Sequence, residues 1–332
     1  MPDLSVIMAT YNRRARLERA LDGLAAQAPS CDAFEVVVVD DGSTDGTAAW
    51  LADLKFPFEI QVLRQENAGP AAARNRGVEA ARAGIVLFLD DDVIAGPTLV
   101  GEHLRSHARE DRVAVIGPLA SLPRYRQPWV AWEQRNIDRQ YRAMLRGDWS
   151  PTFRQFWTGN ASVARSAVLE AGGFDPTLRR GEDVELASRM VAHGIEFRFN
   201  PAASGTHHAE RSLPSWCEMH RAYGRLEISI YRRFGEARAR EILVDNWRGL
   251  HPATKRLVSS CLDRPALAAA ARGVLEASIR AGATLPFLSR PAQAACGALS
   301  NLLYWSGAAE AMGTQGVRAV FATTAAPDRE KK

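Results

Sequence analysis

Three consecutive carboxylates, Asp90, Asp91 and Asp92, follow an apolar run that begins after Gly84. A short apolar run behind a glycine is typical of a strand that is buried on both faces of a parallel sheet. Ligands of open α/β sheets bind beyond the carboxyl ends of the strands, so these carboxylates are expected at the lip of a crevice. Adjacent carboxylates repel one another unless a cation lies nearby, and hard oxygen ligands suit Mg²⁺ or Mn²⁺. The sequence therefore predicts a divalent-cation site at this strand end.

Two further apolar runs also end in polar residues. Thr10-Tyr11-Asn12 follows the first run, and Asp40-Asp41-Gly42-Ser43 follows the second. Each cluster alone has a simpler interpretation, because a strand-end carboxylate can cap the next helix and Ser43 could be the N-cap of a helix reaching residue 54. Three polar strand ends at one edge of a sheet predict a single polar crevice. The sequence shows neither a G-x-G-x-x-G fingerprint after the first run nor a Walker-type loop.

The elements that must position these residues alternate regularly. Strands are expected at 4–10, 34–39, 58–63 and 85–89, with helices between them at 14–27, 43–54 and 70–83. This alternation predicts an α/β fold with a doubly wound, mostly parallel sheet and right-handed crossovers. Further strands at 112–117, 158–163 and 195–199 and helices at 166–172 and 182–193 are expected to extend it.

The second half of this region holds three more candidate groups. Residues 121–157 are rich in tryptophan, and the aromatic faces of Trp129, Trp132, Trp149 and Trp157 suit a sugar ring or a lipid tail, although ordinary packing tryptophans are the simpler interpretation. Glu182 and Asp183 open a helix, where acids are also favoured by the helix dipole, and this dipole should keep Asp183 ionised. His207 and His208 follow a strand end and are candidate metal ligands, with the choice between them open.

Composition limits the class of protein. The chain has 332 residues with a net charge of only +4, which disfavours a dedicated nucleic-acid binder. The four cysteines form no C-x-x-C pair, and neither a signal peptide nor a membrane-spanning helix is evident, so a cytoplasmic protein with reduced thiols is expected.

From residue 211 the sequence predicts basic helices, and Arg272, Glu276 and Arg280 form a charged stripe on an otherwise apolar helix. Such helices could pack on the body, on a second copy of the chain or on the inner face of a membrane.

These motifs, taken together, resemble those of the family 2 glycosyltransferases, which have the GT-A fold. The resemblance covers residues 4–208 and rests on five segments in the order of the family: Ser5–Asn12, Val39–Asp45, Asn67–Gly77, Leu89–Asp92 and Gly181–Asp183. It implies a GT-A domain at 1–210, with a nucleotide-sugar half at 1–117 and an acceptor half at 118–210. Residues 211–332 would then form a helical extension.

The resemblance also implies roles for individual residues. The metal would be held by Asp92, with Asp90 and His207 or His208, and Asp183 would be the catalytic base. Acceptor-side residues would be Trp157, Gly159, Asn160 and Glu182. The nucleotide sugar would be contacted by Thr10, Asn12, Arg13, Asp41, Gly69, Pro70, Arg74, Asp90 and Asp91.

The implied activity is metal-dependent, inverting transfer of a sugar from a nucleotide diphosphate to a hydroxyl group. UDP-sugars are the expected donors because they are frequent in the family, and a glycan, lipid-linked or small-molecule hydroxyl is the expected acceptor. A nucleotidyltransferase is the nearest alternative, but it usually has a glycine-rich loop after the first strand. A receiver domain would be much shorter, and a non-catalytic donor-binding scaffold would not need Asp92 and Asp183.

Overall fold

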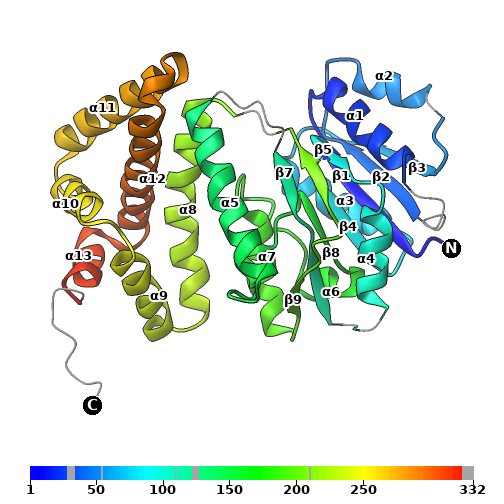
Figure 1. Cartoon of the computed structure of the whole chain (residues 1–332). Coiled ribbons are helices and arrows are strands. Elements are labelled where there is room, and N and C mark those ends of the chain that lie inside the picture. Colours follow the sequence, from blue (N-terminus) through cyan, green and yellow to red (C-terminus); the bar gives the residue numbers. More distant parts are fainter. Residues whose placement is uncertain are drawn as a thin grey trace. The chain divides into compact units, whose positions relative to one another are not determined.

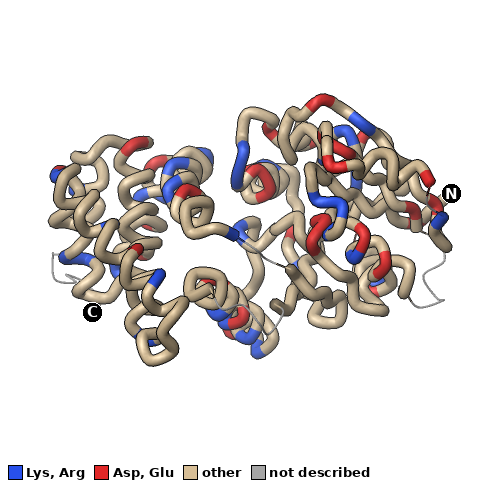
Figure 2. The backbone as a smooth tube through the Cα atoms, turned by 90° about the horizontal axis from the view of Figure 1, so that it is seen from above, with Lys and Arg blue, Asp and Glu red and all other residues tan. Residues whose placement is uncertain are grey.

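The computed structural model describes residues 1–27, 34–53, 55–108, 110, 112–121, 127–208 and 211–323, and Figure 1 shows the order of its elements. The chain forms two compact units, described separately below. Unit 1 comprises Met1–Pro123 and Ile137–Ala209, and unit 2 comprises Arg124–Asn136 and Glu210–Lys332. Figure 2 shows Lys and Arg interspersed with Asp and Glu along the backbone of each unit, which agrees with the small net charge.

Unit 1 is built on a seven-stranded sheet of order β3-β2-β1-β4-β8-β6-β9. Its strands are β1 Leu4–Thr10, β2 Phe34–Asp40, β3 Glu59–Arg64, β4 Ile85–Leu89, β6 Val113–Ile116, β8 Asn160–Ala164 and β9 Glu196–Phe199. All pairs are parallel except those of β8, which runs antiparallel to β4 and β6. The predicted α/β class with a mostly parallel sheet is therefore confirmed.

Helices cover both faces of this sheet. One face packs on α3 Pro70–Ala80, α6 Arg165–Glu170 and α7 Glu182–Ala192, and the other on α1 Arg14–Ala25, α2 Thr47–Ala52 and α4 Leu99–His107. Within β1, Ile7 faces the first core, whereas Val6 and Met8 face the second. This alternation follows from the period of two along a strand, and burial on both sides explains why the strands read as continuous apolar runs.

A second, three-stranded sheet was not expected from the sequence. It consists of β5 Val93–Ala95, β10 Gly205–His207 and β7 Leu119–Ser121, with β10 in the middle. The antiparallel pairing of β10 with β5 puts His207 opposite Val93, directly after the three aspartates. Residues that are more than a hundred positions apart are thereby fixed side by side.

The predicted N-cap at Ser43 is wrong. Helix α2 begins at Thr47 behind its N-cap Gly46, and Asp45 Oδ1 accepts the Thr47 N–H at 3.1 Å. The hydroxyl of Ser43 instead accepts the backbone N–H of Asn12 at 2.9 Å, while the Ser43 N–H donates to Asp40 Oδ1 at 2.9 Å. Ser43 therefore ties the ends of β1 and β2 together, and its side chain is no longer available to a helix.

Unit 2 is helical. Its helices after the first part of α5 (Pro128–Leu145) are α8 Leu213–Arg233, α9 Glu236–Arg248, α10 Pro252–Cys261, α11 Pro265–Thr284, α12 Ser289–Met312 and α13 Thr314–Thr323. The basic helices expected from residue 211 are present, and α8 is separated from α9 by Gly235, whose φ is +94° and suits glycine best. Helices α8 and α12 cross closely at Gly224, where a Cβ would lie 1.9 Å from the Tyr304 carbonyl oxygen. Across the described residues, we find no helix with the length and apolar character needed to cross a membrane.

Three cysteines of unit 2, Cys217, Cys261 and Cys296, are buried and unpaired. Cys31 lies outside the described residues. Burial raises the pKa of the Cys217 thiol to about 11 and that of Cys296 to about 12, so both are protonated at neutral pH.

Candidate active site

The junction of β1 and β4 is a switch point, because β2 and β3 lie on one side of β1 and β4 lies on the other. Polar side chains join the two strand ends there. The Thr10 hydroxyl donates to Asp91 Oδ2 at 2.8 Å, and Arg13 Nη1 donates to Asp91 Oδ1 at 2.9 Å. Burial raises the pKa of the Asp91 carboxyl to about 6, although Arg13 opposes the rise. Asp91 therefore ties the end of β4 to the end of β1.

Asp92 is surrounded by cationic and imidazole groups. Arg13 Nη1 lies 3.4 Å and Arg16 Nη1 3.6 Å from Asp92 Oδ2. His207 Nε2 lies 3.2 Å from Asp92 Oδ1. Burial acts to raise the pKa of Asp92, but His207 and the two guanidinium groups lower it overall. The arginines thus offset part of the electrostatic repulsion between the adjacent carboxylates. Asp92 is therefore ionised at neutral pH.

Arg16 was not singled out in the sequence, although a signal was present. Arg13, Arg14 and Arg16 crowd the start of α1, where the helix dipole disfavours cations. Such an arrangement indicates an anionic partner near that helix end, and here the partner is the acidic strand end of β4.

The donor set at Asp92 fits a divalent cation. Asp92 Oδ1 is buried without a hydrogen bond, and the ring of His207 faces it, so an anionic oxygen and an imidazole nitrogen converge. His208 contacts Asp92 through its backbone, because its N–H donates to the Asp92 carbonyl at 2.8 Å. In the part of the chain that is described, no three His, Cys, Asp or Glu side chains gather closely enough to enclose a metal. Two protein ligands are what Mg²⁺-type sites often use when substrate phosphates supply the rest.

The end of β2 carries a dense hydrogen-bond network. Asp41 Oδ1 accepts Gln65 Nε2 at 2.7 Å and the Ala68 N–H at 2.9 Å, and Asp41 Oδ2 accepts the Gly69 N–H at 2.8 Å. Asp41 therefore shapes the loop that leads through Gly69 to Pro70, the first residue of α3. A direct bond from Asp41 to a nucleotide stays a prediction.

Asn12 joins β1 to the loop after β2. Its Oδ1 accepts the Thr44 N–H at 2.7 Å. Its φ of +52° is in the left-handed region, which asparagine tolerates better than most residues. Asn12 thus turns the chain sharply at the end of β1.

Arg74 connects the two acidic motifs. From the buried face of α3, its Nη2 donates to Asp90 Oδ1 at 2.8 Å and its Nη1 to Glu182 Oε1 at 2.6 Å. The Asp90 side chain is 35% exposed, whereas those of Arg74 and Glu182 are about nine-tenths buried. Arg74 thereby brings an acid of the strand-end triplet and an acid of the α7 start to opposite ends of one guanidinium group.

Asp183 is next to this chain of ion pairs. It is half-buried, and its Oδ1 accepts the Val184 N–H at 2.8 Å. Burial raises the pKa of Asp183 to about 7, and the negative charge of Glu182 adds to the rise, while the Val184 N–H and Arg74 oppose it. The helix N-terminus was expected to keep Asp183 ionised, but burial outweighs the helix dipole and raises the pKa of this carboxyl.

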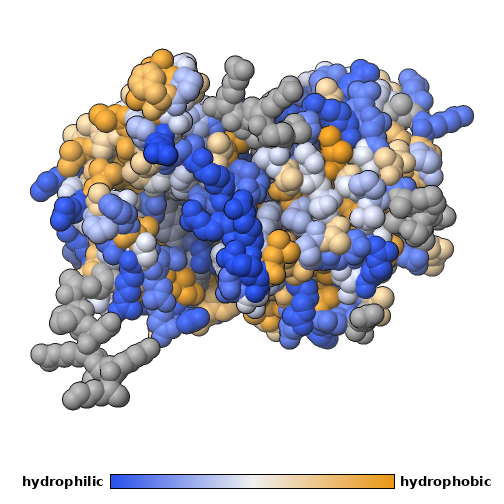
Figure 3. Space-filling view, viewed as in Figure 1, coloured by the Kyte–Doolittle hydropathy of each residue, from blue (hydrophilic) through white to orange (hydrophobic). Residues whose placement is uncertain are grey.

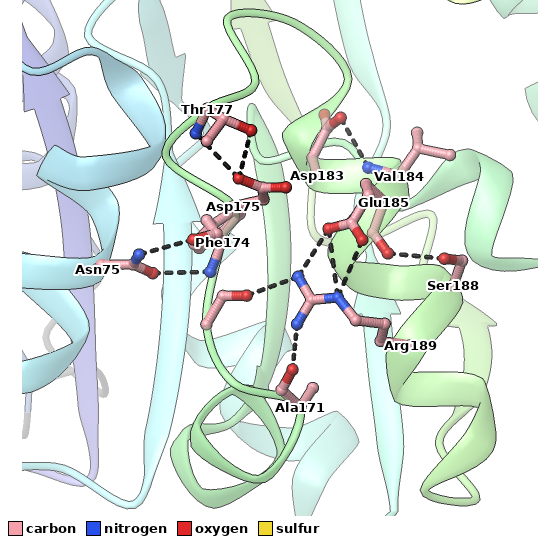
Figure 4. A network of polar contacts seen from close by, with 11 residues as sticks. Asn75, Ala171, Phe174, Asp175, Thr177, Asp183, Val184, Glu185, Ser188 and Arg189 are labelled. Atoms are coloured by element: carbon pink, nitrogen blue, oxygen red, sulfur yellow. Dashed lines mark hydrogen bonds and ion pairs between the residues drawn. The ribbon is translucent and has the colours of Figure 1, made fainter. Parts of the chain in front are cut away.

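The start of α7 is held against the preceding loop (Figure 4). Arg189 reaches back to Glu185 on the same helix and to the carbonyl oxygens of Ala171 and Gly173. Asn75 fixes the same loop from α3, since its Nδ2 donates to the Phe174 carbonyl at 2.8 Å and its Oδ1 accepts the Phe174 N–H at 2.7 Å. These contacts give Asp183 a rigid support.

The other acceptor-side candidates lie around the start of β8. Trp157 makes an edge contact with Tyr141, and a Cβ at Gly159 would lie 3.4 Å from Asp90 Oδ2. Asn160 is buried, with Nδ2 donating to the Ala203 carbonyl at 2.7 Å. The Asn160 side chain therefore holds the start of β8 in place through its bond to Ala203. Gly159, which has no side chain, leaves the space beside Asp90 free.

Asn160 belongs to a buried chain of polar groups that was not predicted. His103 Nε2 lies 2.9 Å from Asn160 Oδ1, His103 Nδ1 lies 2.7 Å from Ser162 Oγ, and His107 Nε2 lies 2.8 Å from the same oxygen. Because Nδ2 of Asn160 donates to a carbonyl, its Oδ1 must accept from His103, so Nε2 of His103 carries the proton. The Ser162 hydroxyl then donates to His103 Nδ1 and accepts from His107. The signal in the sequence was the i, i+4 histidine pair on one helix face.

Residues 5–168 match the sequence model of glycosyl transferase family 2. A similar relative is the validoxylamine A glucosyltransferase of Streptomyces hygroscopicus subsp. jinggangensis, 33% identical over 231 residues that make up 59% of this chain and 53% of that protein. The chain thus spans about half the length of this relative.

Two solved structures show the same fold. One is the mannosyltransferase PcManGT from Pyrobaculum calidifontis in complex with GDP-Man and Mn²⁺, with a TM-score of 0.55, 21% identity and coverage of 98% of this chain and 79% of that one. The other is S. aureus TarS 1–349 in complex with UDP, with a TM-score of 0.55, 17% identity and coverage of 98% and 91%. Through a domain with the GT-A fold, the chain therefore belongs to glycosyl transferase family 2.

Proposed function

We propose that this protein is a metal-dependent, inverting glycosyltransferase that moves a sugar from a nucleoside diphosphate to a hydroxyl acceptor. The observation that carries the proposal is the bridge made by Arg74 between Asp90 and Glu182. It places the acidic triplet, which suits the donor, and the start of α7, which suits the acceptor, around one guanidinium group. A reaction that joins a donor to an acceptor needs this proximity.

Asp92 and His207 would hold the cation, because Asp92 Oδ1 and His207 Nε2 already face each other. When bound, the cation would neutralise the negative charge that develops on the leaving diphosphate. Asp91 has a different task, since its oxygens accept from Thr10 and Arg13 and so fix the backbone on which Asp92 is mounted. Arg74 would keep Asp90 oriented at the edge of the same site.

Asp183 would take the proton of the acceptor hydroxyl. Its raised pKa, about 7, makes it a stronger base than an ordinary carboxylate while leaving a large ionised fraction at neutral pH. The hydrogen bond from Val184 to Oδ1 fixes the carboxylate plane. With one base on the acceptor side and direct attack opposite the leaving group, the configuration at the anomeric carbon is inverted.

For the donor we propose a UDP-sugar, and the neighbours with UDP and with GDP-Man and Mn²⁺ support the nucleotide-sugar class. For the acceptor we propose a hydroxyl group of a glycan, lipid-linked sugar or small molecule, and the relative named as a glucosyltransferase supports sugar transfer. The family domain favours sugar transfer over nucleotidyl transfer.

Thermal unfolding with UDP, GDP, dTDP and CMP, each with Mn²⁺ or with EDTA, tests the donor site. A nucleotide at 100 times its Kd should stabilise the fold by about 2.7 kcal/mol. We expect one diphosphate to raise the Tm only when Mn²⁺ is present, and we expect Asp92→Asn to abolish this rise. Asp22→Asn, which changes an exposed aspartate of α1, is the matched control and should behave like the parent chain.

A turnover assay then distinguishes an enzyme from a donor-binding scaffold. It uses sugar donors of the nucleotide that binds. Release of the nucleoside diphosphate in the presence of hydroxyl acceptors supports the proposal. A metal-dependent Tm shift without release from any donor sugar would favour the scaffold, and no shift with any nucleotide would contradict both.

A further inference from the structure

Most exposed positions of α11 are apolar, and the one acid of this helix, Glu276, lies toward the body of unit 2. The exposed positions of this helix include Ala266, Leu267, Ala270, Val274 and Ala277, and the charged residue Arg280 lies among them. A helix that faces water normally shows the opposite arrangement.

Of the charged stripe on α11, only the acid is shielded, whereas the arginines are exposed, Arg272 by 43% and Arg280 by 58% of their side chains. Glu276 is only 20% exposed and pairs with Arg272 at 2.7 Å and with Arg280 at 3.3 Å. It also lies 3.9 Å from the Cys217 sulfur on α8. Glu276 is thus satisfied within unit 2, and the exposed side of the helix combines apolar side chains with arginines.

This apolar face continues over the turn that follows. The side chain of Val274 is 71% exposed, Leu285 is 42% exposed, and Phe287, in the 3-10 turn η3 Pro286–Leu288, is 77% exposed. Together with Leu267, they are all the exposed large apolar side chains in the described residues of unit 2. Figure 3 shows apolar side chains gathered over α11 and this turn at the upper left of the view.

The surroundings of this face are basic. Between residues 252 and 290 the chain carries six Lys or Arg and two Asp or Glu. Of the two acids, Glu276 is paired as described and Asp263 is paired with Arg318. Arg264 precedes the helix, Arg280 lies on it and Arg290 follows the turn, and all three are exposed.

We propose that this face, Leu267 to Phe287 with its bordering arginines, binds the surface of an anionic lipid bilayer. Apolar side chains would enter the boundary between headgroups and acyl chains, and the arginines would remain at the level of the phosphates. A second copy of the chain fits less well, because apposed copies would bring like-charged arginines together. The inference does not depend on the proposed function, since membrane binding is measured without donor, acceptor or turnover.

Vesicle sedimentation tests the proposal with the full chain. Vesicles of phosphatidylcholine are compared with vesicles of equal parts phosphatidylcholine and phosphatidylglycerol, and the protein should pellet with the second kind. The double variant Val274→Asp with Phe287→Asp should bind at least about 100-fold more weakly. The reason is that two apolar side chains that would be buried in the bilayer are replaced by charged ones. Arg264→Gln with Arg290→Gln should weaken binding about 30-fold on the anionic vesicles alone.

The matched control is Leu169→Asp, which places the same charge on an exposed leucine of unit 1 and should bind like the parent chain. Near-UV circular dichroism and an unchanged Tm show that each variant is folded. Failure of the parent chain to pellet with anionic vesicles, or equal weakening by the control, would overturn the proposal. Light scattering that shows a dimer without lipid, converted to a monomer by the double aspartate variant, would assign the face to a second copy instead.

Discussion

Two buried polar clusters of unit 1 differ in the way their polar groups are satisfied. The cluster at the ends of β1 and β4 consists of carboxylates paired with arginines, as in Asp91 with Arg13 and Asp90 with Arg74. The cluster beneath β8 consists of neutral groups, His103, His107, Ser162 and Asn160, that satisfy one another. The first leaves the Asp92 Oδ1 atom without a hydrogen bond, whereas no atom of the second is left so.

The difference separates chemistry from support. Fixed charges at the open edge of a sheet can receive a cation and a proton, and they cost stability unless counter-charges are present. The neutral hydrogen-bonded cluster in the interior has no charge with which to bind a cation or take up a proton. Its hydrogen bonds instead specify which strands and helices pack together. The two clusters should therefore respond differently to substitution and to pH.

The largest effect is expected for Asp183→Asn. Removing a general base should lower kcat by about 10³-fold, and the metal-dependent Tm shift with nucleotide should persist because the donor site is intact. Activity of the parent chain should decline as the pH falls below about 7, where Asp183 becomes protonated. Single-turnover rates across pH 5 to 9 measure both. Near-parental turnover of the variant would remove Asp183 from the mechanism.

Arg74→Met should cost about 3 kcal/mol of unfolding free energy, because it leaves Asp90 and the buried Glu182 without their counter-charge. Urea unfolding measures the loss, and Arg74→Lys should recover part of it, since lysine keeps the charge but not both hydrogen bonds. Arg225 bridges Glu218 and Glu310 in a similar way at an exposed site of unit 2, so Arg225→Met is the comparison. A loss with Arg225→Met as large as that with Arg74→Met would contradict the importance given to burial.

Much of the charged cluster could be predicted from the sequence. The apolar runs that end in Asp40 and in Asp90 are local signals, and parallel pairing brings such ends to one edge of the sheet. The error at Ser43 arose because a local cap was preferred to bonds with Asn12 and Asp40, and only the first two strands together supply those partners.

The remaining features depend on contacts between distant segments. The pairing of β10 with β5 selects His207 as the residue beside Asp92, and nothing local distinguishes His207 from His208. The pKa of Asp183 likewise depends on burial by the surrounding fold, whereas the dipole of α7 was visible in the sequence. The histidine chain was missed because its partner Ser162 lies on another element.

The neutral cluster should make stability depend on pH. Burial lowers the pKa of His103 and of His107 to about 4. In the unfolded chain both imidazoles titrate near pH 6.5. Below that pH the unfolded state therefore binds more protons than the folded state, and the unfolding free energy falls. The loss reaches about 3 kcal/mol per histidine as the pH approaches 4. Urea unfolding at pH 7.5 and pH 5 should show this loss. His103→Gln should make the loss smaller, whereas His193→Gln, at an exposed position, should leave it unchanged.

The smallest effects are expected from a matched pair of hydroxyl deletions, one in each cluster. Ser162→Ala removes a hydroxyl that serves two histidines, so two buried ring nitrogens lose their partner and about 2 kcal/mol of unfolding free energy is lost. Thr10→Val removes one hydrogen bond to Asp91, which keeps its bond from Arg13, and about 1 kcal/mol is lost. Urea unfolding at pH 7.5 compares the two. A larger loss of unfolding free energy with Thr10→Val than with Ser162→Ala would mean that the charged cluster depends more on its neutral hydrogen-bond donors than on its arginines. The two clusters would then differ in their position in the sheet rather than in their charge.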